Sequence, residues 1–141
     1  MCGYCGTIVT SREETSDMEQ VTRENSKAAY KKLLAFQKAD QLVHGIYNLS
    51  VHFPKEEVFS FTSQIRRSAL SVTANIIEGH ARNSKNEFRH FLSVALGSLT
   101  ETEYYLEFAF KRKWISIKQY EEIESLRSEC GKLLWKLYKS Q

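Results

Sequence analysis

Hydrophobic residues recur every three or four positions along most of the chain, which is the spacing of one face of an α-helix. Four such segments lie between residues 28 and 137, and polar or turn-forming residues separate them. Only one proline and six glycines occur in 141 residues, whereas a sandwich of short strands needs many turns. The pattern therefore predicts an all-α protein with four amphipathic helices.

The first two predicted helices are separated by Pro54. The first helix runs from residue 28 or 31 to about His52, and Pro54 ends it because proline cannot continue a helix. The second helix begins between residues 56 and 60 and ends near Gly79, since glycine is a common residue at helix C-termini.

The starts of the third and fourth predicted helices each carry the spacing of a capping box. The side chain of Ser84 can accept the backbone N–H of Glu87, and the side chain of Glu87 can accept the backbone N–H of Ser84. The apolar stripe that follows them continues to about Lys113. Ser116 and Gln119 repeat this spacing before a last stripe that ends near residue 137. Four helices with short connections predict an up-down-up-down antiparallel four-helix bundle over residues 28–141.

Residues 1–27 differ in composition from the rest of the chain. They hold clusters of Ser, Thr and Glu, more acidic than basic residues, and little apolar periodicity. Such a segment buries too little apolar area to offset the entropy lost on ordering, so we expect a mobile N-terminal extension. Met18 offers an alternative start, which leaves open whether residues 1–17 belong to the native protein.

None of the cysteine residues is assigned to chemistry, and the pair near the N-terminus is interpreted as incidental. Cys2 and Cys5 form a CxxC pair, but a structural zinc site needs a second pair of ligands, and no nearby pair supplies it. Cys130 lies in an apolar stripe and is expected in the core. Gly97 weakens the third helix by about 1 kcal/mol relative to alanine, so we expect a close helix approach there. No metal or cofactor is expected.

A polar stripe runs along the second predicted helix, beside its apolar face. Its members recur at intervals of three or four residues: Arg67, Ser71, Asn75, Glu78 and Arg82.

The sequence has no GxSxG elbow, P-loop, HExxH motif or second carboxylate at a catalytic spacing, so we expect that the protein is not an enzyme. Glu78 and Arg82 are four residues apart in the acidic-before-basic order that favours a simple pair.

Several segments resemble a family of small four-helix-bundle proteins encoded in intervening sequences of bacterial large-subunit ribosomal RNA genes. The matching segments are FQKADQLVHGIYNLSVHFP at residues 36–54, QIRRSALSVTANIIEG at 64–79 and FLSVALGSLTETE at 91–103. The resemblance extends over about three quarters of the chain. Thr73 stands where the family often has a proline, and it keeps the backbone donor that proline lacks.

The resemblance implies that the protein forms a symmetric homopentameric ring. Proteins of a related branch of the fold are accessory subunits of reverse transcriptases and have nucleic acid as a partner, so the resemblance also implies RNA or DNA as a possible partner.

Arg67 and Glu101 belong to the RR and GSxxE segments that recur in the family. We expect them to form a buried ion pair, because a buried charge is tolerable chiefly when it is paired. Asn75 and Glu78 would extend this structural polar network. A ligand site at the same residues is the alternative.

Basic residues outnumber acidic ones, and the net charge is +3. Two basic clusters are candidates for contact with RNA or DNA phosphates: Arg82, Lys85 and Arg89 in the first, and Lys111, Arg112 and Lys113 in the second. Binding through such contacts weakens steeply as salt rises. The same cations are equally compatible with an ordinary solubilising surface.

The C-terminal part of the chain has more aromatic residues than the core of a thin bundle can bury, which predicts that some of them lie at a subunit interface.

No apolar run approaches the roughly 20 residues that span a bilayer, and no signal-peptide pattern precedes the bundle. We therefore expect a cytoplasmic, self-associating bundle that binds RNA or DNA through its basic clusters. A protein-binding adaptor without nucleic-acid binding is the alternative.

Overall fold

The computed structural model describes residues 28–141, which form four α-helices and two short 3₁₀ turns. In chain order these elements are η1 (Ala29–Lys32), α2 (Leu34–Ser50), η2 (Lys55–Glu57), α3 (Phe61–Ala81), α4 (Lys85–Lys111) and α5 (Ile117–Lys139). The prediction of an all-α protein with four helices is confirmed. The extension predicted at residues 1–27 lies outside the described residues.

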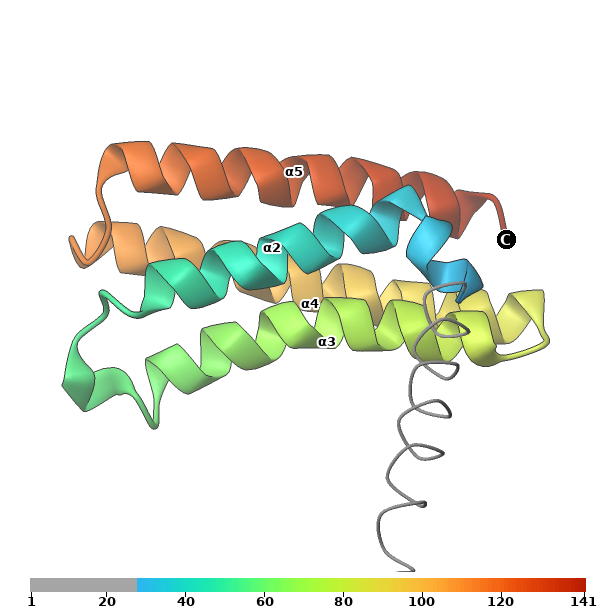
Figure 1. The fold of residues 1–141 in the computed structure, drawn as a ribbon, viewed down its shortest axis with the longest axis horizontal. Coiled ribbons are helices and arrows are strands. Elements are labelled where there is room, and N and C mark those ends of the chain that lie inside the picture. Colours follow the sequence, from blue (N-terminus) through green and yellow to red (C-terminus); the bar gives the residue numbers. More distant parts are fainter. Residues whose placement is uncertain (1–27) are drawn as a thin grey trace, which may run out of the picture.

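The four helices form an antiparallel bundle with up-down-up-down connections (Figure 1). α3 packs against α2 and α4, and α5 packs against the same two helices from the other side. Each helix therefore has two neighbours around a shared core, as expected when short connections join consecutive helices. The α3–α4 connection and the C-terminus lie at one end of the bundle, and the other two interhelical connections lie at the opposite end.

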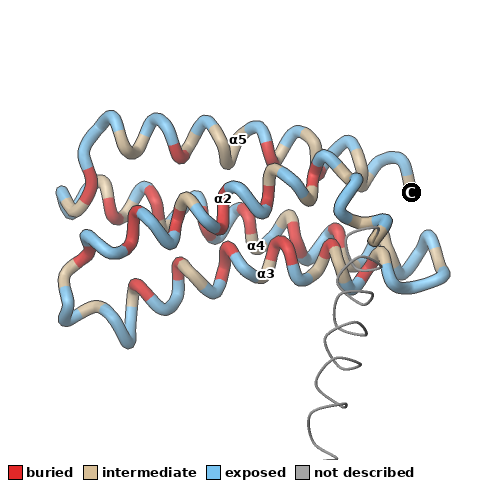
Figure 2. The backbone as a smooth tube through the Cα atoms, viewed as in Figure 1, coloured by how far each residue is buried: buried red, intermediate tan, exposed pale blue. Residues whose placement is uncertain are grey.

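The core consists of aliphatic side chains along the inner stripe of each helix, and Figure 2 shows where the buried positions lie. They follow the three- and four-residue spacing of the sequence. The largest fully buried aliphatic side chains are Leu42, Ile46, Ile65, Ile76, Leu92, Leu106 and Leu134. Burial of each such side chain stabilises the fold by about 1.5–3 kcal/mol, so the bundle depends mainly on apolar packing.

Local signals set where the helices begin. Pro54 precedes the turn η2, which delays the start of α3 to just beyond the predicted residues 56–60. Ser84 caps α4 by accepting the backbone N–H three residues later, at 3.4 Å between oxygen and nitrogen. Ser116 and Gln119 form both hydrogen bonds of a capping box before α5. The predicted capping box at Ser116 is thus confirmed, whereas at Ser84 only the cap by the serine hydroxyl forms.

The prediction that Gly97 permits a close helix approach is wrong within the chain, where Gly79 and Gly45 have this role instead. Gly79 is buried inside α3, and a Cβ atom added there would lie 2.7 Å from the Cβ of Phe91 on α4. A Cβ added at Gly97 would meet no atom within 4 Å. Helical spacing placed Gly97 on α4, but only the rotation of that helix in the bundle shows that it faces outward.

Candidate functional site

A seam of small polar side chains joins α3 to α4. Ser68 of α3 and Thr102 of α4 are both buried, and their hydroxyl oxygens lie 2.9 Å apart. Ser71 and Ser98 form a second hydroxyl pair at the same distance. These short side chains allow the two backbones to approach while each hydroxyl keeps a hydrogen-bond partner. The seam is therefore a contact between helices.

Asn75, from the predicted polar stripe, belongs to this seam. Its side-chain amide donates to the carbonyl oxygen of Ser71 at 2.7 Å and to the hydroxyl of Ser71 at 3.0 Å. These bonds lie beside the contact between Ser71 and Ser98. The amide donor of Asn75 is thus used within the bundle, which fits a structural role better than ligand binding.

Glu78 and Arg82 form the simple pair predicted from their spacing. The Nη2 atom of Arg82 lies 3.1 Å from Oε1 of Glu78, and both side chains are about half exposed. The Arg82 guanidinium also lies over the ring of Phe91, 5.4 Å from its centre. An exposed pair of this kind contributes at most about 1 kcal/mol, so both charges remain available to a charged partner.

The expected buried ion pair between Arg67 and Glu101 is wrong within this chain. Both residues are exposed, and no ion pair joins them within residues 28–141. Glu101 instead accepts a hydrogen bond from the hydroxyl of Tyr105 at 2.8 Å, and this bond raises the pKa of that tyrosine. The neighbouring residues Ser68 and Thr102 face the seam instead, because one step along a helix turns the side chain by about 100°.

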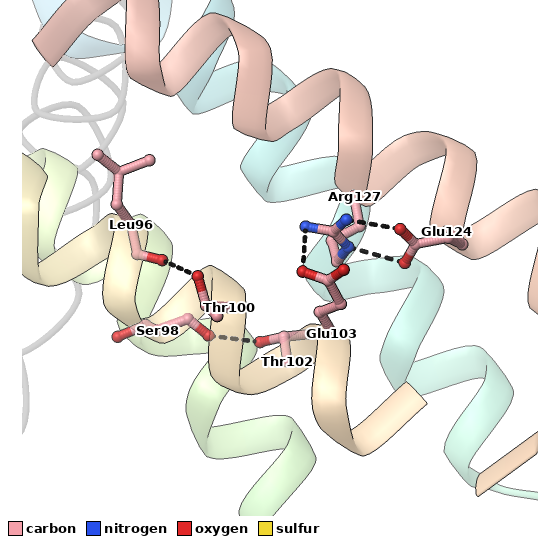
Figure 3. Close-up of polar contacts among 7 residues, drawn as sticks. All are labelled: Leu96, Ser98, Thr100, Thr102, Glu103, Glu124 and Arg127. Carbon is pink, nitrogen blue, oxygen red and sulfur yellow. Dashed lines mark hydrogen bonds and ion pairs between the residues drawn. The ribbon is translucent and has the colours of Figure 1, made fainter. Parts of the chain in front are cut away.

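A charged cluster that the sequence did not single out joins α4 to α5 (Figure 3). The side chain of Arg127 on α5 is only 13% exposed, and its Nη1 atom lies 3.3 Å from Oε2 of Glu103 on α4. Its Nε donates to Glu124 at 2.7 Å, and the hydrogen bonding to Glu124 raises the pKa of Arg127. The only sequence signal was the three-residue spacing of Glu124 and Arg127, which is common on exposed helix faces.

The α3–α4 connection forms a polar hollow of about 350 Å³ at one end of the bundle. Basic, amide and hydroxyl side chains line it together with one aromatic ring: His80, Arg82, Asn83, Ser84, Lys85, Phe88 and Gln141. Arg82 and Lys85, which are two of the predicted nucleic-acid contacts, therefore meet at one site. The free N–H groups at the start of α4 add partial positive charge to the same region.

Arg89, the third residue of this basic cluster, faces the end of α5. Its guanidinium carbon lies 4.7 Å from the centre of the Tyr138 ring. Tyr138 stacks on Trp135, with ring centres 5.3 Å apart and an angle of 22° between the ring planes. The Nζ atom of Lys139 lies 5.7 Å from the centre of the Trp135 ring. The structure thus joins a predicted basic cluster to an aromatic pair that sequence reasoning had assigned only to a subunit interface.

The second predicted basic cluster lies at the opposite end of the bundle, where α4 ends (Figure 1). Lys111 pairs with Glu107 at 3.7 Å, and Arg112 lies over the ring of Trp114 at 5.8 Å. Lys113 adopts a φ of 61°, a left-handed conformation that often terminates a helix. The six predicted contacts therefore form two separate sites at opposite ends of the bundle.

Residues 28–141 contain no group of three or more His, Cys, Asp or Glu side chains placed to hold a metal ion. Cys130 is buried, as predicted, and burial raises the pKa of its thiol to about 12. A thiol with this pKa stays protonated at neutral pH and is a poor nucleophile. In the same part of the chain, no helix combines the length and apolarity needed to cross a membrane.

A family model described as "23S rRNA-intervening sequence protein" matches residues 31–136, which extend from the start of the bundle into its last helix. The chain belongs to this family. A crystal structure from Bacteroides thetaiotaomicron, described as a protein with unknown function from the S23 ribosomal protein family, is 34% identical in sequence. Its TM-score is 0.69, with 75% of this chain and 96% of that chain covered. No curated protein matches the chain.

Membership of the 23S rRNA-intervening sequence protein family confirms the resemblance identified from the sequence motifs. The B. thetaiotaomicron relative shares the fold over nearly its whole length. Neither description names an activity, a ligand or a partner. For this member of the 23S rRNA-intervening sequence family, function must therefore be argued from the surface of the bundle.

Proposed function

We propose that this protein is a non-enzymatic, cytoplasmic helical bundle that self-associates and binds RNA or DNA through the basic surface at the α3–α4 end. The observation that carries the proposal is the polar hollow lined by His80, Arg82 and Lys85, with Arg89 one turn further along α4. Phosphate is the natural partner of such a surface, because side-chain cations and helix N–H groups both attract it.

The distribution of acidic residues favours this end of the bundle over the other. No Asp or Glu follows Glu129, whereas Lys132, Lys136 and Lys139 lie along the last turns of α5. At the opposite end, Lys111 is paired with Glu107. The α3–α4 end also carries carboxylates, Glu78 beside Arg82 and Glu87 in the first turn of α4, so its attraction for phosphate comes from the excess of cations on α4 and α5 there.

Self-association is supported by the outward faces of α3 and α4. Leu70, Val94 and Tyr104 are 43%, 42% and 60% exposed, and the space around Gly97 is open. Exposed apolar residues beside a glycine provide a surface that another helix can approach closely. Several copies would bring their basic ends together and raise the avidity for one nucleic-acid strand. A homopentamer is the state implied by the family resemblance.

The first test is the mass of the full-length protein by light scattering, followed by RNA and DNA binding across a salt series. We expect an oligomer whose binding weakens with salt. Lys85→Glu with Arg89→Glu should weaken binding and lower the salt slope, by about 0.7–0.9 for each phosphate that is no longer neutralised. Lys55→Glu with Lys118→Glu changes the net charge equally at exposed positions and is the matched control. Equal effects of the two double variants would contradict a localised site.

A protein-binding adaptor is the second candidate, and Phe59 favours it. This side chain is 97% exposed in the α2–α3 connection, next to the half-exposed Val58. Exposed large apolar side chains in a connection are typical of protein interaction sites. An oligomer that binds neither RNA nor DNA at low salt would shift the function to this candidate.

A further inference from the structure

We infer that Trp135 and Tyr138 form a stacking platform for the unpaired bases of single-stranded nucleic acid. The inference rests on the proposed function and specifies which form of nucleic acid the basic end recognises. Trp135 is 51% exposed, although it is held in an ordered stack with Tyr138. A stacked, half-exposed aromatic pair is suited to bases because every base offers a flat face, and such stacking tolerates any sequence.

Cations from two helices surround this platform. Arg89 of α4 lies over Tyr138, and Lys139 of α5 lies near Trp135. Lys132 is exposed three residues before Trp135, which places it on the same face of α5. The platform thus combines the two components of a single-strand site, aromatic rings for bases and positive charge for phosphates.

The Lys139 ammonium, which lies over the Trp135 ring, can be displaced by a base. Its ammonium lies 5.7 Å from the ring centre, close to the limit of about 6 Å for a cation–π contact. The residue is exposed and lies in the last turn of its helix. A base can therefore replace the ammonium over the ring, and the displaced ammonium can then pair with a phosphate of the same strand.

The platform adjoins the basic hollow. Lys85 lines the hollow, and Arg89, one turn later on α4, contacts Tyr138. Gln141, three residues after Tyr138, also lines the hollow. A strand whose phosphates lie at the hollow can thus place neighbouring bases over the rings. A duplex keeps its bases paired and stacked on each other, so it gains the phosphate contacts alone.

Fluorescence of Trp135 tests this inference directly. The chain has two tryptophans, so the full-length Trp114→Phe variant reports on Trp135 alone. It is titrated at low salt with single-stranded oligo-dT and, separately, with heparin, which carries charge but no bases. We expect oligo-dT to quench the emission and heparin to leave it nearly unchanged. Equal quenching by both, or binding of oligo-dT without quenching, would overturn the stacking inference.

Affinities of variants give a second, independent test. Trp135→Ala should weaken oligo-dT binding about tenfold and change duplex affinity less than about twofold, since stacking contributes to the single strand only. Trp135→Phe should retain most of the affinity and keeps the test valid if the alanine variant folds poorly. Phe59→Ala removes an exposed ring far from the basic surface and should have no effect.

The outcomes separate this inference from the proposed function. Unchanged oligo-dT affinity in Trp135→Ala, or an equal loss for single strand and duplex, contradicts stacking even if Lys85→Glu with Arg89→Glu weakens both. Failure of the wild-type protein to bind either form at low salt contradicts the proposed function itself, and the platform with it.

Discussion

Arg127 of α5 contacts Glu103 of α4 at 3.3 Å while it also bonds Glu124 on its own helix. The guanidinium is almost covered, with 13% of the side chain exposed, whereas the side chain of Glu103 is 47% exposed. A slide of either helix by one turn would separate Arg127 from Glu103. The ion pair is therefore formed only in the observed register of the two helices, and it adds to the stability of that register.

Removal of the Arg127 side chain should destabilise the bundle. We expect Arg127→Ala to lower the free energy of unfolding by about 1–2 kcal/mol, because two carboxylates lose their partner but remain exposed enough to be rehydrated. Urea denaturation measures the change. Lys111→Ala removes an exposed pair with Glu107 and should change stability by less than about 0.5 kcal/mol. A similar loss in both variants would mean that Arg127 has no special role.

Replacement by alanine should have opposite effects on the stability of the chain at Gly79 of α3 and at Gly97 of α4. Gly79→Ala places a Cβ against Phe91 and should destabilise the protein by about 1–2 kcal/mol, since overpacking exceeds the gain in helix propensity. Within one chain Gly97→Ala meets open space and should stabilise the helix by up to about 1 kcal/mol, whereas in the proposed oligomer the added Cβ should hinder the neighbouring helix and lower the mass. Thermal unfolding with mass measurement distinguishes the two. Loss of both stability and oligomeric mass in Gly97→Ala would place this residue at a subunit contact.

The buried hydroxyl pair in the seam should show coupling between its members. We expect Ser68→Ala and Thr102→Val each to destabilise the protein, and the double variant to lose less than the sum. The difference should be about 0.5 kcal/mol, because each remaining hydroxyl loses the bond between the helices but keeps a carbonyl of its own helix, Ile65 for Ser68 and Ser98 for Thr102. Ser68→Ala combined with Thr100→Val, which is exposed and bonded within α4, should be additive. Additivity in both cycles would remove the energetic role of the seam.

Cys130 should make stability depend on pH in the alkaline range. Burial raises the pKa of this thiol from 9.0 to about 12, so ionisation favours the unfolded chain once the pH exceeds 9. The contribution is fully present below pH 9 and is lost as the pH rises toward 12, with a slope of at most about 1.4 kcal/mol per pH unit. Urea denaturation at several pH values measures this slope.

To assign this slope to Cys130, we compare two proteins that both carry Cys2→Ser and Cys5→Ser, so that Cys130 is the only thiol in the first of them. Further replacement of Cys130 by alanine should make the alkaline decline shallower. Tyr120 also has a pKa raised by burial, but it contributes equally to both proteins and cancels in the difference. Equal slopes with and without Cys130 would contradict a folded-state thiol pKa near 12.

Local features of the fold were predictable because they depend on neighbours in the sequence. Pro54 and the cap at Ser116 determine helix boundaries through bonds within a few residues. The pair between Glu78 and Arg82 is equally local, since four residues make about one helical turn. Predictions that needed two helices to meet were less successful. The predicted ion pair between Arg67 and Glu101 is wrong because both residues are exposed, while their neighbours Ser68 and Thr102 are buried in the seam.

The sequence by itself determined four helices, their order, their caps and the apolar stripe of each, since all of these follow from spacing within one segment. The tertiary structure decided which polar side chains meet, because that depends on how far each helix slides and rotates against its neighbours. Contacts such as Arg127 with Glu103, and Arg89 with Tyr138, join residues more than twenty positions apart. The spacing of residues within one helix does not specify how that helix is aligned with its neighbours. The packing of side chains in the shared core specifies this alignment.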